Sequence, residues 1–126
     1  MMFNRPDMVW GSAPAKSSQD HFAGKLILIV DAGCMLACED FTMPFKDKQR
    51  ATLVRETTAG SSGQPYMLDL GKGMMIMIGA KREIFPDGSR FEGVGIKPDV
   101  EAVPSPADWK QGRNTVLEAA CKQGAL

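Results

Sequence analysis

The feature that most constrains this chain is a junction within residues 25–45, where an apolar run passes through a turn into a segment of helical character. Residues 26–30 are apolar and favour β-structure, the run ends at Asp31, and Gly33 lies in the turn that follows. Such a junction exposes one side chain beside the free N–H groups and the positive dipole end of a helix, and many enzymes hold a nucleophile there. The side chains that this turn presents are those of Cys34, Met35 and Leu36, with no serine among them.

The strand and the helix of this junction can both be predicted from the residue pattern. Because residues 26–30 are apolar on both faces, they predict a central, covered strand that runs parallel to a neighbour. A helix is predicted from about Leu36 towards Lys48, with a kink or an interruption at Pro44 because proline cannot donate to the helix ladder. The apolar stripe of this helix is predicted to contain Ala37, Phe41 and Phe45.

Length and composition indicate one ordinary globular domain. A chain of 126 residues, 44% of them hydrophobic, can bury a real core. Fifteen basic residues balance fifteen acidic ones, which argues against a nucleic-acid-binding surface or a basic membrane patch. The uncharged apolar runs are too short to span a bilayer, and residues 1–20 contain no apolar core of signal-peptide length, so no export signal is visible.

The three cysteines, Cys34, Cys38 and Cys121, are predicted to be structural thiols. An odd number of cysteines argues against a disulfide framework, and free cysteines are commonly buried. Cys34 and Cys38 are four positions apart, a spacing that would place them on one face of a helix. Metal binding would need more ligands than these cysteines and His21, the only histidine, so no metal or other cofactor is expected.

The rest of the chain divides into an irregular N-terminal arm, residues 1–23, and a body, residues 24–126. In the body, an antiparallel hairpin is predicted from Tyr66–Leu70 and Met74–Ile78, with its methionines Met74, Met75 and Met77 filling the core. The other predicted elements are a short strand at 51–54, extended segments at 82–85 and 91–100 on either side of a turn at 86–88, a turn at 107–109 and a helix at 115–122.

The segment 56–65, ETTAGSSGQP, is rich in small and hydroxyl residues. A loop of this composition can carry a backbone binding site, and the alternative is a flexible surface connection.

From Gly24 onward, four blocks of sequence resemble the carboxyl-terminal processing (tail-specific) proteases, a family of serine peptidases that includes a tricorn-like branch. The blocks occur in the order that the family has, and the third, following an ETT loop, is the most specific. They are LILIVDAGCMLACEDF, RATLVRETTAGSSGQP, PDGSRFEGVGIKPDVEA and GRNTVLEAA.

This resemblance implies a crotonase-like α/β fold, in which mixed strands are flanked by helices and of which this chain would hold the C-terminal part. It also implies an activity, the cleavage of peptide bonds in peptides or unfolded proteins by a serine acyl-enzyme mechanism. Relatives are often exported. No cofactor is implied.

In the family pattern T-x-S-A-x-E the serine is the nucleophile, and Leu36 stands at its position. A leucine has no group that can attack a carbonyl, so we expect that the chain as written forms no acyl-enzyme there. The backbone N–H of Ala37 is expected to be one oxyanion donor. The second donor would come from a stretch resembling D-x-R-x-N-x-G-G, which the sequence lacks, and one donor can be worth about 10²–10³ in rate.

The supporting residues point to the tricorn-like branch. Ser61 stands where the processing proteases have their lysine base, whereas the tricorn-like branch supports its serine with a histidine and a glutamate. Glu92 is the candidate for that glutamate, and the alternative is a solvated acid at a strand edge. His21 lies too close to Leu36 in sequence to be the histidine. The loop residues expected to bind substrate are Thr57, Thr58, Gly60 and Ser61.

Three hypotheses follow. The chain is an incomplete and inactive piece of a serine peptidase, or a non-catalytic relative that binds peptide along the loop and a strand edge. In the third, Cys34 or Cys38 acts as the nucleophile, although each lies two positions from the expected site. Because missing upstream strands would leave sheet edges and apolar surface uncovered, we also expect the chain to form homo-oligomers or to be poorly soluble.

Overall fold

The computed structural model describes residues 20–61, 65–80 and 82–124, so most of the predicted arm, residues 1–23, lies outside the described residues. Within these, a parallel sheet contains β1 (Ile27–Val30), β2 (Thr52–Arg55) and β5 (Val100–Glu101) in the order β1-β2-β5. The parallel pairing of the first strand is confirmed. Among the described residues this strand lies at the edge of the sheet and not at its predicted central position, because β2 takes the middle and Ile29 of β1 is exposed.

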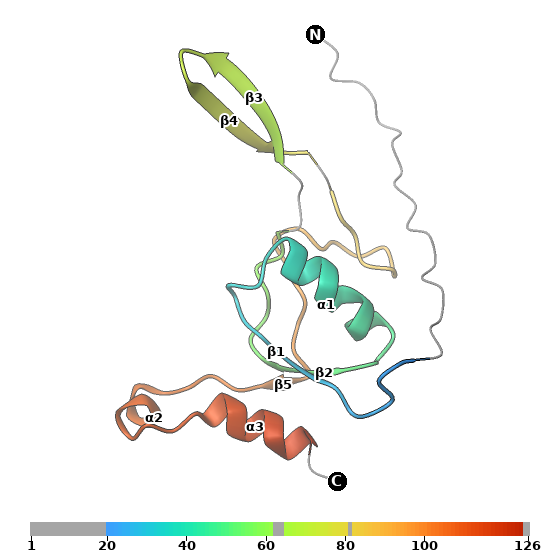
Figure 1. Ribbon diagram of the computed structural model, residues 1–126, viewed down its shortest axis with the longest axis vertical. Helices are drawn as coiled ribbons and strands as arrows, with labels where there is room; N and C mark the ends of the chain where they lie inside the picture. Colours follow the sequence, from blue (N-terminus) through green and yellow to red (C-terminus); the bar gives the residue numbers. More distant parts are fainter. Residues whose placement is uncertain (1–19, 62–64, 81, 125–126) are drawn as a thin grey trace.

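Helices lie on both sides of this sheet, as Figure 1 shows: α1 (Ala37–Asp47) on one side and α3 (Thr115–Gly124) on the other, where α3 contacts β1 and β2. The mixed α/β class predicted from the sequence is confirmed. Between β5 and α3 the chain forms a short helix, α2 (Pro106–Lys110), where only a turn was predicted. A capping box starts α2, since Ser105 and Asp108 exchange hydrogen bonds, and these bonds from Ser105 lower the pKa of Asp108.

The helix α1 differs from the prediction in two respects. The helix is not interrupted at Pro44: the Lys48 N–H donates to the Pro44 carbonyl at 3.0 Å, so the ladder resumes one turn later. The predicted apolar stripe does not face the core either, because Phe41 is largely exposed. The buried residues of α1 are instead polar, namely Glu39 and Thr42.

The hydrophobic core packs against α1 and takes its residues from β1, the turn after it, β2 and the segment 91–96. It contains Phe91 and Leu53, both fully buried, together with Ile96, Val30 and Cys34. Phe91 and Ile96 belong to a segment that was predicted to be extended. They lie instead on either side of a tight turn, in which the N–H groups of Val94 and Gly95 donate to the Phe91 carbonyl.

The cysteines differ from the prediction. Cys34 and Cys38 form a disulfide, and the exposed Cys121 is the free thiol. The sequence spacing suggested two cysteines on one helix face, but Cys34 precedes α1 while Cys38 lies in its first turn. The turn brings their Cα atoms to 5.3 Å, a separation that a disulfide spans readily.

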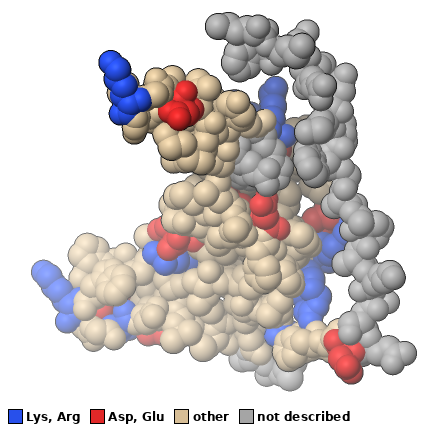
Figure 2. Space-filling view, turned by 45° about the horizontal axis from the view of Figure 1, so that its top comes forward, with Lys and Arg blue, Asp and Glu red and all other residues tan. Residues whose placement is uncertain are grey.

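The predicted hairpin is confirmed as β3 (Pro65–Gly71) and β4 (Met74–Gly79), paired antiparallel. Its predicted burial is wrong, because every residue of both strands is exposed, including Met74, Met75 and Met77. Figure 1 shows the hairpin projecting away from the parallel sheet, and Figure 2 shows it as a largely uncharged lobe. Neither strand pairs with any other strand among the described residues.

Between the hairpin and β5, the predicted turn is confirmed and the predicted extended segment at 82–85 is found only in part. The Gly88 N–H donates to the Phe85 carbonyl at 2.8 Å, which closes the turn at 86–88. The extended segment at 82–85 is reduced to one isolated bridge, between Ile84 and Arg90. No helix in the described parts of the chain is long and apolar enough to cross a membrane.

The exposed hairpin leads to a prediction about association. A two-stranded sheet with apolar side chains on both faces is marginally stable in water, so we expect copies of the chain to associate through it. Replacing Met77 with lysine, at a residue 68% exposed, should shift the sedimentation profile towards monomer. The matched control is Val103→Lys, at a residue 66% exposed outside the hairpin, which should leave the profile unchanged. A wild-type chain that sediments as a sharp monomer would contradict this prediction.

Candidate active site

The turn before α1 holds Leu36 in a backbone conformation that a leucine rarely adopts. Leu36 is the N-cap residue of α1, with φ 53° and ψ −122°, and its side chain is 42% exposed. A positive φ is uncommon for a residue with a branched side chain and persists only where the surroundings enforce it. The junction therefore presents one side chain on a strained strand-to-helix turn, the geometry in which hydrolases hold a nucleophile.

Ala37 follows as the first residue of α1. The N–H groups at the start of a helix have no acceptor within the helix, and the helix dipole adds a partial positive charge there. The Ala37 N–H therefore lies where a helix can donate a hydrogen bond to an anion, and its role as an oxyanion donor stays a prediction.

Two backbone hydrogen bonds hold the loop at 56–61 against this turn. The Leu36 N–H donates to the Ser61 carbonyl at 2.9 Å, and the Ala59 N–H donates to the Cys34 carbonyl at 3.0 Å. The loop is therefore a fixed part of the junction at these positions, in contrast to the flexible connection considered from composition.

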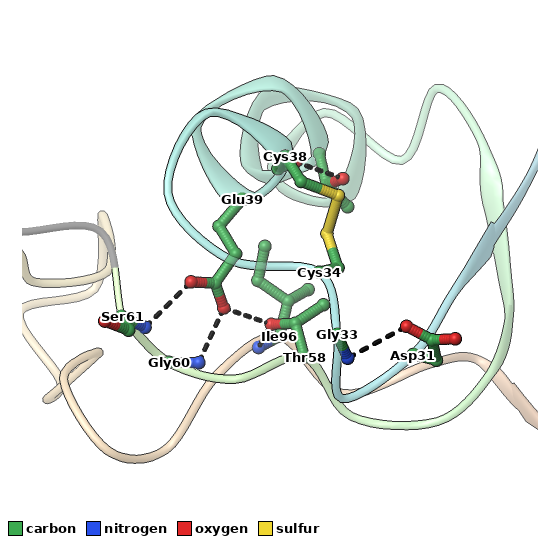
Figure 3. Close-up of a disulfide and its surroundings, with 10 residues drawn as sticks. Asp31, Gly33, Cys34, Cys38, Glu39, Thr58, Gly60, Ser61 and Ile96 are labelled. Carbon is green, nitrogen blue, oxygen red and sulfur yellow. Dashed lines mark hydrogen bonds between the residues drawn. A yellow bond between two sulfur atoms is a disulfide. The ribbon is translucent and has the colours of Figure 1, made fainter.

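Glu39 is the residue that organises this region, and the sequence prediction did not include it among the site residues. Its side chain is fully buried, and Figure 3 shows it pointing from α1 into the loop. The Glu39 carboxylate accepts hydrogen bonds from the hydroxyl of Thr58, from the N–H of Gly60 at 2.6 Å and from the N–H of Ser61 at 2.8 Å. The available signal was its place three positions after Leu36, on the helix face that turns inward.

Thr58 extends this network to the segment after Phe91. Its N–H donates to the Ile96 carbonyl at 3.2 Å, and its hydroxyl accepts from the Ile96 N–H at 2.8 Å. The Gly93 N–H in turn donates to the Gly60 carbonyl at 2.7 Å. The loop bound by the Glu39 carboxylate thus also binds the segment 93–96, so that three segments far apart in the sequence meet here.

Comparison with known proteins decides the family. The sequence model of peptidase family S41 matches residues 5–102 of this chain. The chain belongs to peptidase family S41. The match begins at residue 5, upstream of the Gly24 at which the resemblance was seen to start.

Individual similar proteins are consistent with this assignment. The chain is 27% identical over 118 residues to a Streptomyces coelicolor protein named as a tricorn protease homolog, covering 92% of this chain and 10% of the relative. Among solved structures, the photosystem II D1 C-terminal processing protease matches with a TM-score of 0.55 and 27% identity, over 79% of this chain and 24% of that one. The tricorn protease shares the fold, with a TM-score of 0.71 at 24% identity, over 79% of this chain and 10% of that one. The chain thus spans a small part of the relatives it matches.

Two S41-like blocks, the ETTAG loop and the GVGIKPD segment, meet at a pair of glycines. A Cβ atom added to Gly95 would lie 2.2 Å from the Thr58 carbonyl oxygen, and one added to Gly60 would lie 2.5 Å from the Gly95 nitrogen. Both glycines have positive φ, 68° at Gly60 and 73° at Gly95. Only glycine satisfies both the backbone conformation and the close approach at these positions.

Asp99, at the end of the GVGIKPD segment, connects the sheet to α1. Asp99 accepts a hydrogen bond from the Leu53 N–H at 2.8 Å, and its other oxygen pairs with the Lys46 ammonium. Partial burial acts to raise the pKa of Asp99, but the hydrogen bonds from Lys46 and Leu53 outweigh it, so that the pKa lies below its usual range. Asp99 is therefore ionised at neutral pH and serves as a structural anchor.

The predicted substrate-binding residues of the S41 loop differ in accessibility. Thr58 and Gly60 are buried, and the Thr58 hydroxyl and the Gly60 N–H donate to Glu39, so both residues stabilise the conformation of the loop. Thr57 is half-buried and Ser61 is exposed, and substrate binding by these two stays a prediction.

The predicted acid, Glu92, is half-buried between Phe91 and Gly93. Its Oε1 accepts from the Glu83 N–H at 3.4 Å, and the adjacent Gly93 contacts the loop at Gly60. The backbone next to Glu92 is therefore hydrogen-bonded to the loop, while the catalytic role of Glu92 stays a prediction. Among the described residues, no group of three or more histidine, cysteine or acidic side chains could hold a metal.

Proposed function

We propose that this chain forms the nucleophile-bearing part of a serine-type peptidase domain of the tricorn-like branch, with Leu36 at the nucleophile position. The single observation that carries this proposal is the backbone of Leu36, strained at φ 53° directly before α1 and secured to Ser61. The fold thus maintains a costly conformation for presenting one side chain.

In this proposal, a serine at position 36 would attack a peptide carbonyl and the Ala37 N–H would stabilise the resulting oxyanion. The leucine supplies no proton to remove and no lone pair for the attack. We therefore infer that the chain as written is inactive as a peptidase, while its substrates in the family context would be peptides or unfolded proteins.

A second function, peptide binding without cleavage, is favoured by a cavity beside the same segments. This cavity of about 340 Å³ lies between α1 and the segments 85–89 and 94–97, and its lining includes Met43, Phe85 and Ile96. An apolar hollow of this size could take one or two side chains of an extended peptide. The third hypothesis, a cysteine nucleophile, loses its support because Cys34 and Cys38 are bonded to each other.

The nucleophile assignment can be tested by replacing Leu36 with serine. We expect Leu36→Ser to become labelled by a fluorophosphonate probe, because the serine hydroxyl would stand on the strained turn beside the helix N-terminus. The measurement is mass spectrometry of the labelled peptide, together with hydrolysis of an unstructured test peptide.

The matched control is Met35→Ser, because Met35 is the adjacent residue and is exposed to a similar extent, 47% against 42%. Labelling at position 36 and not at position 35 would support the assignment. Equal labelling of both variants would overturn it. Binding of the test peptide without turnover in both the wild type and Leu36→Ser would favour the second function.

A further inference from the structure

The Cys34–Cys38 disulfide encloses the candidate nucleophile position. Its two cysteines lie at equal distances in sequence on either side of Leu36, so that the bond closes the turn into a small ring. Figure 3 shows the bridge running from the turn to the first helical turn of α1, on the same helix that carries Glu39. The disulfide therefore ties the turn on one side of Leu36 to α1 on the other side.

The two halves of this disulfide differ in accessibility. Cys34 is 6% exposed and belongs to the core cluster with Val30 and Phe91. Cys38 is exposed, in the first turn of α1. A bond with one shielded and one accessible cysteine has a preferred side for attack, a condition for selective thiol–disulfide exchange.

We propose that Cys34–Cys38 is a redox-exchange site for a dithiol, and that its state controls the order of the turn at Leu36. The proposal does not depend on peptide cleavage, because it concerns the cross-link and the backbone around it. Its reaction partner is a compound or protein with two neighbouring thiols.

The exchange balances in two steps. A thiolate of the dithiol attacks the Cys38 sulfur, forming a mixed disulfide and releasing Cys34 as a thiolate that takes up a proton. The second thiol of the partner, as its thiolate, attacks the partner's own bonded sulfur and releases Cys38. The protein disulfide gains two electrons and two protons, and the partner becomes a cyclic disulfide. The position of Cys38 at the start of α1 favours the second step, because the positive end of the helix dipole stabilises a leaving thiolate.

The consequence for the turn follows from its hydrogen bonds. The Cys34 carbonyl accepts from Ala59, and Leu36 donates to Ser61, so the loop is attached to residues inside or at the edge of the ring. Reduction removes the covalent restraint on the positive φ of Leu36. The backbone of the turn can then adopt other conformations, in which the Leu36–Ser61 and Ala59–Cys34 hydrogen bonds are broken. We expect the Leu36 and Ala59 amides to exchange with deuterium about tenfold faster after reduction.

The experiment uses the whole chain with Cys121→Ser, which removes the one cysteine outside the disulfide. The protein is equilibrated with buffers of reduced and oxidised dithiothreitol, the thiols are trapped by alkylation, and amide exchange is measured in parallel. The expected result is reversible reduction, with faster exchange at residues 34–36 and 59–61 and unchanged exchange in α3. Resistance to millimolar dithiothreitol, unchanged exchange at the turn, or a rise in α3 that matches the rise at the turn would each overturn the proposal.

A second measurement tests the preferred side of attack without relying on reduction. In the Cys121→Ser background, Cys34→Ser leaves Cys38 free and Cys38→Ser leaves Cys34 free. The free Cys38 should react with an aromatic disulfide reagent at least about tenfold faster than the free Cys34, because Cys34 is buried. Equal rates, or a faster reaction at Cys34, would contradict the proposed direction of exchange.

Discussion

Replacing Gly95 with alanine is expected to destabilise the protein by about 3–4 kcal/mol, because the site has no room for an added methyl group. A left-handed backbone costs alanine about 1–2 kcal/mol. The added Cβ would also lie 2.2 Å from the Thr58 carbonyl oxygen, so the loop must move away. That movement disrupts the two hydrogen bonds between Thr58 and Ile96, each worth about 1 kcal/mol. Denaturant unfolding measures the total.

The chain offers a control that separates the two causes. Gly88 has a similar positive φ, 83° against 73° at Gly95, but an added Cβ would meet nothing within 4 Å. Gly88→Ala should therefore lose only the conformational part, about 1–2 kcal/mol. If the two alanine variants were equally stable, the close approach between the loop and the GVGIKPD segment would not be a determinant of this fold.

The fold could be predicted from the sequence where local pattern decides it. The hairpin 66–78 was predicted because its two apolar runs flank a glycine-rich turn, and the first strand because residues 26–30 form a short apolar run. Burial was not predictable in the same way. The methionines of the hairpin resemble core residues, yet they are exposed, because burial depends on which other elements cover the strand.

The candidate site, too, could be predicted from the sequence only in part. The turn followed from the order of strand, glycine and helix, which placed Cys34, Met35 and Leu36 on it, and the family resemblance then singled out Leu36. The disulfide was not, because it depends on the turn bringing Cys34 beside the first turn of α1 rather than on spacing along one helix. Glu39 was missed because an acidic residue is normally assigned to the surface, and only the convergence of loop N–H groups makes its burial favourable.

The role of Glu39 yields the second large effect. Glu39→Gln should destabilise the protein by about 3 kcal/mol, although the side chain keeps its size. The Glu39 carboxylate accepts at both oxygens, Oε1 from Thr58 and Gly60 and Oε2 from Ser61. A glutamine can keep one of these oxygens, but its amide NH₂ then faces an N–H donor, either that of Ser61 or that of Gly60. A hydrogen bond to a charged group is lost and a buried donor stays unsatisfied, a combination that costs about 3 kcal/mol.

The matched control for this substitution is Glu118→Gln, the same chemical change on a carboxylate that is 45% exposed and pairs with Arg113 at 2.9 Å. An exposed ion pair contributes about 0–1 kcal/mol, so this variant should stay close to the wild type. Amide exchange localises the effect: Glu39→Gln should accelerate exchange at Gly60 and Ser61 before the core, because these N–H groups lose their acceptor or their fixed partner. A loss below about 1 kcal/mol for Glu39→Gln would show that the loop is held mainly by its backbone bonds to Cys34 and Leu36, and that the carboxylate only fills the space between them.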